Sequence, residues 1–264
     1  AVGGTQTSLV TLSALAHKEH QGSQFLGHGI EKGRAGLVMA NSASDAGNSE
    51  YDIRKKMIEA GIIKQMVTLP SNMFSSVTLP ATLWFFDNAK KNTDKKDEIL
   101  FVDARNVFTQ VDRAHRKFSE EQIKNLAIIT RLYEGDTAAF ADLIAEYKAN
   151  LANAPETSED KDVMTKSYWQ ANIDWLLERF PDGVYRDVVG LCKVAKLDGE
   201  DGIIDQDYSL NPGRYVGVVI EDDGMTAEEF KAEMLSLNEE LAMLNEEAHK
   251  LEDRITENLK GLFT

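Results

Sequence analysis

The sequence has little sulfur and few metal-binding side chains: one cysteine, Cys192, and five scattered histidines among 264 residues. A lone cysteine excludes an internal disulfide and is typical of a reducing compartment, so we expect a cytoplasmic protein. The histidines and the cysteine do not have the spacing of zinc ligands, and we predict no metal site. The sequence also lacks an apolar run of about 18 residues, so it predicts no membrane contact.

Basic residues are scarce as well. Lysine plus arginine total 29 against 44 aspartate plus glutamate, a formal net charge of −15. A chain this acidic does not by itself attract nucleic-acid phosphates. Either it binds no nucleic acid, or a partner supplies most of the phosphate contacts. One local basic group stands out, whose members could contact phosphates, pair with acidic residues or be solvated: Arg105, Arg113, Arg116 and Lys117.

Residues 34–103 have the pattern of an α/β unit. Residues 35–40 form a short, almost wholly apolar run, which is typical of a strand buried on both faces. A helix follows, with Ser49 as its cap and Gly61 at its end. Further β-prone stretches are residues 62–69, 78–86 and 99–102. This order predicts an α/β fold that ends in an antiparallel segment.

Helical patterns dominate later in the chain. Ser119 and Gln122 form a capping box at the start of one helix. After Gly135 two further stretches carry apolar residues at helical spacing, so we expect a helical region over residues 136–221. Residues 1–33 are rich in small and polar residues with no sustained period, and we assign them no fold.

The last segment, residues 222–264, has the clearest pattern in the sequence. Thr226 and Glu229 form a second capping box. Apolar residues then alternate steps of four and three, which is a heptad seam sustained over about five heptads. The other faces are charged, so the seam needs a partner, and we predict a subunit interface. Its residues are Phe230, Met234, Leu237, Leu241, Leu244, Leu251 and Ile255.

Three stretches, in this order, resemble the modification subunit of type I restriction–modification systems, an adenine-N6 DNA methyltransferase. They are residues 33–46, the pair Met73-Phe74 placed before residues 78–86, and residues 207–217 followed by the heptad helix. Residues 101–105 and 111–116 are also similar to that family. Each stretch alone is a weak signal, and their shared order makes the resemblance specific.

The resemblance implies a fold and a reaction. Such subunits have a Rossmann-like methyltransferase domain followed by a helical tail, which here would end in a long coiled-coil-like helix. They transfer a methyl group from S-adenosylmethionine to N6 of adenine in DNA. On this basis residues 34–135 correspond to the second half of the methyltransferase domain, and residues 222–264 to the helix that docks on another subunit.

Two motifs that define this chemistry do not occur in the sequence. One is the glycine-rich turn that holds the methyl donor, and the other is the Asn/Asp-Pro-Pro-Phe/Tyr motif that binds the target amine. The only Asn-Pro pair, Asn211-Pro212, is followed by glycine. We therefore expect a C-terminal fragment without catalytic residues, which binds no S-adenosylmethionine and does not methylate DNA alone.

The resemblance also gives two candidates for a target-base pocket. In the family's fold the loop after residue 69 lies at the mouth of the catalytic pocket, where Phe74 could pack against a base flipped from the duplex. The alternative is that Phe74 belongs to the ordinary core. Asn41 follows the first strand at its carboxyl end, where α/β sheets place ligands. The alternative for Asn41 is a turn former.

The partners implied are the specificity subunit, which would recognise most of the DNA, the restriction subunit, and DNA within the complex. Self-association is a further option. The competing hypothesis is a non-catalytic assembly module that joins two proteins through its heptad helix. The strands of residues 34–103 argue against a purely helical adaptor but leave a degenerate, non-catalytic relative open.

Overall fold

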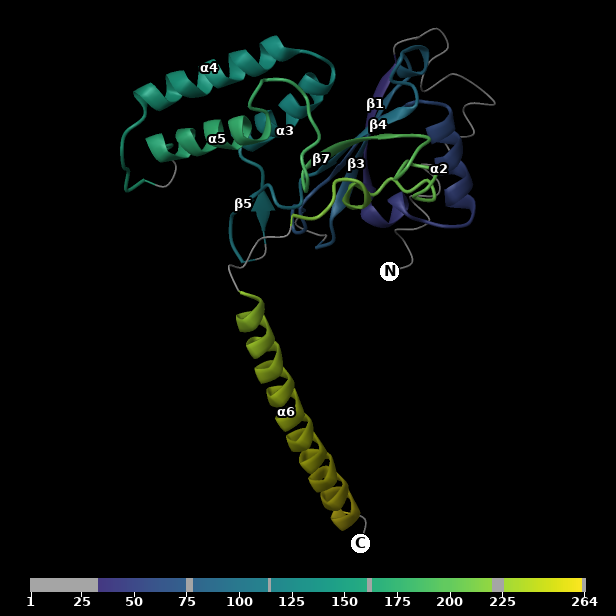
Figure 1. Cartoon of the computed structure of the whole chain (residues 1–264), viewed down its shortest axis with the longest axis vertical. Coiled ribbons are helices and arrows are strands. Elements are labelled where there is room, and N and C mark those ends of the chain that lie inside the picture. The colour runs from purple at the N-terminus through teal and green to yellow at the C-terminus, as the bar shows by residue number, and fades with distance from the viewer. Residues whose placement is uncertain (1–32, 75–77, 114, 161–162, 220–225, 263–264) are drawn as a thin grey trace. The chain divides into compact units, whose positions relative to one another are not determined.

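The computed structural model describes residues 33–74, 78–113, 115–160, 163–219 and 226–262. The chain divides into two compact units, residues 1–219 and residues 220–264. The first unit is a mixed α/β structure, as the sequence predicts, and the described part of the second is one helix (Figure 1). No helix among the described residues is long and apolar enough to cross a membrane.

Five strands of the first unit form one sheet. They are β1 (Arg34–Ala40), β2 (Ile63–Thr68), β3 (Ala81–Asp87), β4 (Glu98–Asp103) and β7 (Cys192–Lys196). The order across the sheet is β1-β3-β2-β4-β7. β2 and β4 are parallel, and the other neighbouring pairs are antiparallel. All four strands predicted before residue 103 are present, and β7 comes from the region expected to be helical.

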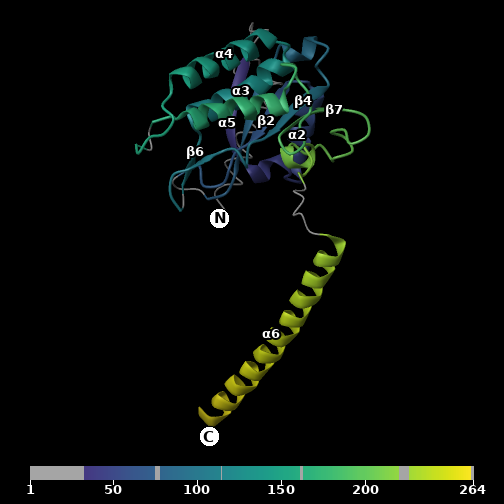
Figure 2. The same ribbon diagram turned by 60° about the vertical axis from the view of Figure 1, so that its left-hand side comes forward.

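Helices cover parts of both faces of this sheet. On one face lie α3 (Glu120–Tyr133), α4 (Thr137–Asn153) and α5 (Lys166–Arg179), which group together in both views (Figures 1 and 2). On the other face lie α2 (Ser49–Glu59) and residues 203–216. Successive strand residues point to opposite faces, so Leu100 packs in the core with α3 and Phe101 in the core with α2.

Shorter elements complete the first unit. They are the hairpin strands β5 (Thr109–Gln110) and β6 (Arg116–Lys117) and the 3-10 helices η1 (Asn41–Ser44), η2 (Lys90–Asn92) and η3 (Pro212–Arg214).

β1 is an edge strand among the described residues, so the expectation that residues 35–40 are buried on both faces is wrong there. β1 pairs with β3 and with no other described strand. Met39 faces the core with α2 and is buried, whereas Val38 is 60% exposed. Gly36 lines an open, mainly apolar groove of about 730 Å³ between the sheet and α3. One face of the run, with Ala35, Leu37 and Met39, packs on the core with α2, whereas on the other face Gly36 borders the groove and Val38 is exposed.

The helix starts follow the sequence at two of three positions. The Ser119 hydroxyl accepts from the Gln122 amide and the Gln122 side chain accepts from the Ser119 amide, which confirms the capping box of α3. The Thr226 and Glu229 capping box is also present. Ser49, however, is the first helical residue of α2 and not its cap. Asn48 precedes it with a positive φ of 55° and ψ of −133°, outside the left-handed helical region.

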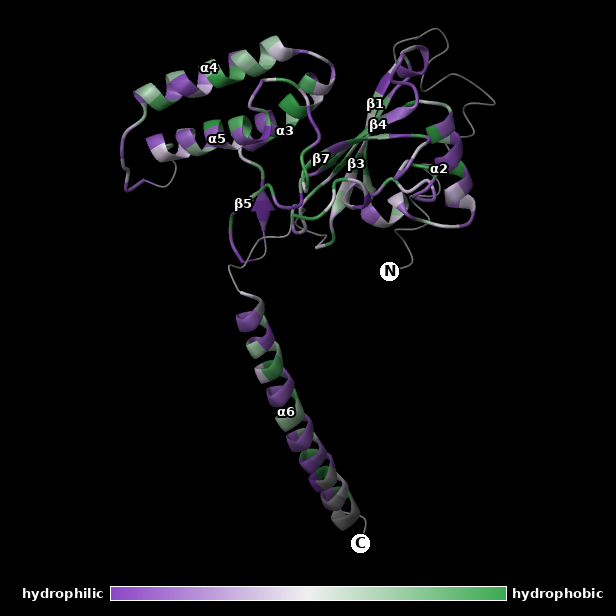
Figure 3. Ribbon diagram, viewed as in Figure 1, coloured by the Kyte–Doolittle hydropathy of each residue, from purple (hydrophilic) through white to green (hydrophobic). Residues whose placement is uncertain are grey.

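α6 (Ala227–Leu262) is one helix of 36 residues. Its polar and apolar residues alternate along the ribbon (Figure 3). The seven seam residues predicted from the sequence are each 50–59% exposed. The helix is therefore present as predicted, and within its own unit no other described element covers the apolar seam.

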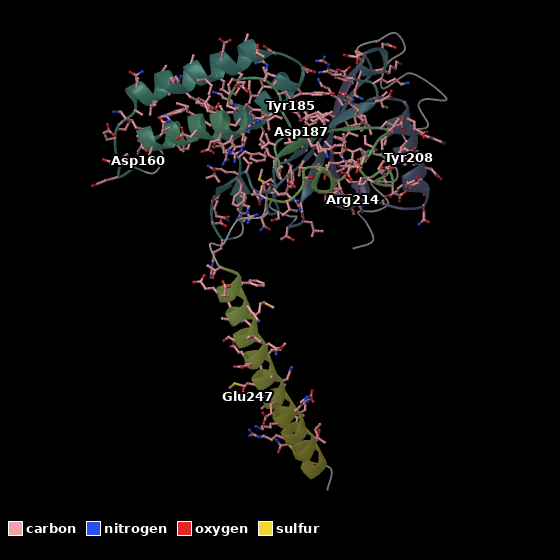
Figure 4. The ribbon with its side chains drawn as sticks, viewed as in Figure 1. Asp160, Tyr185, Asp187, Tyr208, Arg214 and Glu247 are labelled. Carbon is pink, nitrogen blue, oxygen red and sulfur yellow. The ribbon has the colours of Figure 1, made fainter. Side chains whose placement is uncertain are left out.

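A buried arginine joins α2 to residues 203–216. Arg54 is only 2% exposed. Its Nε donates to the carbonyl oxygen of Tyr208 and its Nη1 to that of Ala46, both at 2.7 Å. Tyr208, labelled in Figure 4, also donates its hydroxyl to Glu59 of α2 at 3.0 Å. Because a guanidinium holds several N–H donors in one plane, a single side chain connects the main chain of two segments.

Replacing Arg54 with methionine should destabilise the first unit. Methionine removes the donor from the buried carbonyl oxygen of Tyr208 and from the partly buried one of Ala46, and we expect the free energy of unfolding in urea to fall by about 2–5 kcal/mol. Lys56→Met, at an exposed position of the same helix, is the matched control and should change it by less than about 0.5 kcal/mol. Equal stability of the two variants would contradict the anchoring role of Arg54.

Candidate functional site at the carboxyl edge of the sheet

Three strands end at the same edge of the sheet. β1 and β2 are both antiparallel to β3 and therefore run in the same direction, and β4 is parallel to β2. Ala40 and Thr68 lie opposite Ala81 and Thr82 at the start of β3, and Asp103 lies beside Thr68. The segments that leave these strands start next to one another. In α/β proteins, ligands bind at this carboxyl edge.

Asn41 is the first residue after β1 and opens η1. Its side-chain oxygen accepts a hydrogen bond from the Thr82 hydroxyl of β3 at 2.8 Å. This bond orients the amide and leaves its NH₂ group as the part that can meet a ligand. Asn41 thus lies at the strand end where the sequence places it, and its role in a pocket stays a prediction.

Phe74 lies in the connection between β2 and β3. It is 40% exposed and is not a member of either hydrophobic core. An exposed ring in the segment that leaves β2 is available to stack on a planar ligand. Its contact with a base stays a prediction.

Arg105 is paired within the chain. Its Nε and Nη2 donate to the two carboxylate oxygens of Asp103 at 2.5–3.0 Å. These hydrogen bonds raise the pKa of Arg105. The guanidinium also lies against Gly213, where a Cβ atom would come within 3.0 Å of Nη2. Arg105 therefore links the end of β4 to residues 207–217, and Asp103 already balances its charge.

The other three basic candidates lie in the β5–β6 hairpin. Arg113 and Lys117 are exposed. Arg116 is partly buried, and its Nη1 donates to the Ser71 hydroxyl at 3.1 Å. The four residues that look alike in the sequence therefore divide into two that are held by other residues of the chain and two that are exposed to solvent.

Asp45 organises contacts that the sequence analysis missed. Its carboxylate accepts from the Ser209 hydroxyl and, at 3.1 Å, from the Asn211 side-chain amide. Arg214, labelled in Figure 4, lies 3.4 Å from the same carboxylate. These contacts join residues 33–46 to residues 207–217, two of the stretches that carry the resemblance. Their polar side chains are visible in the sequence, but their pairing across 164 residues has no signal in any local spacing.

Neither a metal-binding group nor a reactive thiol is found among the described residues. Among them, no group of three or more His, Cys, Asp or Glu side chains could hold a metal ion. Cys192 is buried at the start of β7, and burial raises the pKa of its thiol to about 12. Such a thiol is protonated at neutral pH and is a poor nucleophile.

Comparison with known families gives a match over more than half of the chain. The N-6 DNA methylase family model matches residues 11–154. The match begins within residues 1–33, to which the sequence analysis gives no fold and which lie, apart from Gly33, outside the described residues.

Individual relatives are methylase subunits of type I restriction enzymes. That of MjaIX from Methanocaldococcus jannaschii is 32% identical over 238 residues, which cover 90% of this chain and 34% of the relative. That of HindI from Haemophilus influenzae is 32% identical over 240 residues, with 89% and 41% covered. The chain therefore spans well under half the length of either relative.

A solved structure also matches part of this chain. The methyltransferase subunit of a type I restriction–modification system from Streptococcus thermophilus has a TM-score of 0.42 and 20% identity, over 71% of this chain and 27% of that one.

Proposed function

This chain belongs to the N-6 DNA methylase family, and we propose that it is part of the modification subunit of a type I restriction–modification enzyme. The complete subunit would transfer a methyl group from S-adenosylmethionine to N6 of adenine in DNA. Because the chain spans 34% and 41% of two such relatives, we assign this activity to a longer protein. Residues 34–135 would contribute part of its methyltransferase domain.

The position of Asn41 and Phe74 in segments that leave one sheet edge carries the proposal. An aromatic amine is a poor nucleophile, so the adenine must leave the duplex and be held with its amine aimed at the methyl donor. An exposed phenylalanine ring can stack on the base. The NH₂ group of Asn41, oriented by Thr82, can donate to an acceptor on the base.

The described residues do not fit the methyl donor. A nucleoside bound at such an edge uses a carboxylate for its ribose hydroxyls. Two carboxylates at the edge, among the residues that the structure describes, already have partners: Asp45 has Ser209, Asn211 and Arg214, and Asp103 has Arg105. We therefore assign donor binding to other parts of the longer protein and derive no step through the donor.

Contact with the DNA backbone is assigned to the two of the four basic candidates that are exposed, Arg113 and Lys117. A net charge of −15 is too unfavourable for this chain to hold DNA by itself. The specificity subunit would make most of the DNA contacts, and the restriction subunit would join the same complex.

The seam of α6 is proposed to dock on a helix of the specificity subunit. Burying each of its apolar side chains contributes about 1.5–3 kcal/mol. The helix α4 cannot cover the seam, because its own apolar residues are already buried in the first unit: Phe140, Leu143, Ile144 and Tyr147. We propose that a second chain supplies the partner surface.

A non-catalytic assembly module is the second candidate, and the uncovered seam of α6 is the observation that favours it. Both candidates need the seam, whereas only the methyltransferase needs the carboxyl edge. Variants at the edge and at the seam therefore separate them.

This chain alone should not bind S-adenosylmethionine or methylate DNA. The measurement is isothermal titration calorimetry, with the complete subunit as the positive control. Saturable binding in the micromolar range by this chain would contradict both the assignment of donor binding elsewhere and the fragment interpretation.

In the complete subunit with its specificity partner, Phe74→Ala should lower the methylation rate and leave donor affinity nearly unchanged. Loss of base stacking is worth about 1–3 kcal/mol, which corresponds to a fall of roughly tenfold or more. Leu79→Ala, which removes another exposed apolar side chain from the β2–β3 connection, is the control. If Phe74→Ala methylates at the parent rate, Phe74 does not contact the base.

Replacing Leu241 and Leu244 together with aspartate should abolish co-purification with the specificity subunit. Two charges would lie in the middle of the seam, where their burial is too costly. The matched control replaces Leu235 and Met243 with aspartate, since both are similarly exposed but lie off the seam. Circular dichroism should show the α/β unit folded in both variants. A complex of undiminished affinity with the seam variant would refute the docking assignment.

A further inference from the structure

We propose that Arg116 is a positioning residue, which holds the turn of residues 70–74 against the β5–β6 hairpin and so fixes Phe74 at the sheet edge. The proposal rests on the proposed function, because it assumes that Phe74 stacks on the target base. Arg116 would thus make contacts within the protein at this edge and not contacts with DNA phosphates.

Arg116 forms hydrogen bonds with two successive residues of the turn. Its main-chain N–H donates to the carbonyl oxygen of Asn72 at 2.9 Å. Its Nη1 donates to the hydroxyl of Ser71 at 3.1 Å, across 45 residues of sequence. The main chain and the side chain of one residue thus hold the turn, two and three residues before Phe74.

The arginine side chain is itself held in place. Its Nε lies 3.3 Å from the side-chain oxygen of Gln110, to which it donates. Its guanidinium carbon lies 4.0 Å from the centre of the Phe108 ring, within the range of a cation–π contact. Three directions of the guanidinium are therefore occupied, and its geometry is set before any ligand arrives.

The turn needs such an anchor. Asn72 adopts a left-handed conformation, with φ 61°. Asparagine adopts it more readily than most other non-glycine residues, so the constraint on the turn has to come from its contacts. Among the described residues of the connection, the Asn72 amide donates to the carbonyl oxygen of Thr78 in a long hydrogen bond of 3.3 Å. The contacts of Arg116 are the shorter ones at this turn.

Arg116→Lys separates positioning from phosphate binding. Lysine keeps the positive charge, so a phosphate contact would survive, but it has no planar fork and cannot bond Ser71 and Gln110 together. In the complete subunit with its specificity partner, we expect Arg116→Lys and Arg116→Ala both to lower the single-turnover methylation rate about tenfold. The KM for DNA and the donor affinity should stay near the parent values.

The salt dependence of DNA binding tests the alternative, in which Arg116 contacts a DNA phosphate. Removing one phosphate contact reduces the slope of log affinity against log salt by about 0.9. We expect Arg116→Ala to leave this slope unchanged, whereas Lys117→Ala, the neighbouring exposed residue, should reduce it. A reduced slope in Arg116→Ala, together with parent-like methylation by Arg116→Lys, would overturn the proposal.

Hydrogen exchange on this chain alone tests the clamp without any methylation assay. Arg116→Ala retains the main-chain bond to Asn72 but loses the side-chain bonds, so the amides of residues 71–74 should exchange at least about tenfold faster. Unchanged exchange refutes the clamp, whatever the enzyme does. Faster exchange with an unchanged methylation rate refutes the positioning role. In that case a lowered methylation rate in Phe74→Ala would leave the proposed base pocket intact, whereas an unchanged rate would refute the base pocket as well.

Discussion

The antiparallel insertion of β3 between β1 and β2 is the constraint on which the candidate site depends. Because β3 runs back between two strands of common direction, its first residues lie at the edge where β1 and β2 end. Thr82 is thereby placed to bond Asn41. The same reversal forces the connection that carries Phe74 to begin and end at that edge. One strand thus determines the surroundings of both candidate pocket residues.

The sequence predicts the strands well and their neighbours poorly. Apolar runs and β-prone residues locate β1 to β4 within a few positions, because these signals are local. An apolar run indicates that its residues contact other apolar groups, but it does not indicate which strand provides them. The sequence therefore predicts, wrongly, that β1 is buried on both faces. β7 is missed because Lys193 and Lys196 interrupt its apolar pattern, and its pairing with β4 spans about 90 residues.

The residues of the candidate site are likewise predictable only in part. The position of Asn41 at a strand end follows from the order of strands and loops, whereas Phe74 is singled out only through the resemblance to the family. The contacts of Arg54 and Asp45 could not be predicted, since their partners come from residues that are remote in sequence. The basic group shows why. Charge and spacing are the same whether a guanidinium faces a carboxylate, as Arg105 does, an adjacent turn, as Arg116 does, or solvent. Only the tertiary neighbours distinguish these roles.

The acidity of the chain is unevenly distributed, and this bears on how an acidic protein could serve DNA chemistry. Residues 226–264 carry ten acidic and four basic residues, so this segment accounts for six of the fifteen net negative charges. Glu233, Glu240 and Glu247 recur every seven residues beside the seam. In an antiparallel pair of two α6 helices these carboxylates would face one another, whereas a partner helix with lysine or arginine on that flank would neutralise them. Under the proposed function, the negative charge that opposes direct DNA binding would thus favour a basic helix of the specificity subunit as the partner of α6. That subunit would in turn make the contacts with DNA.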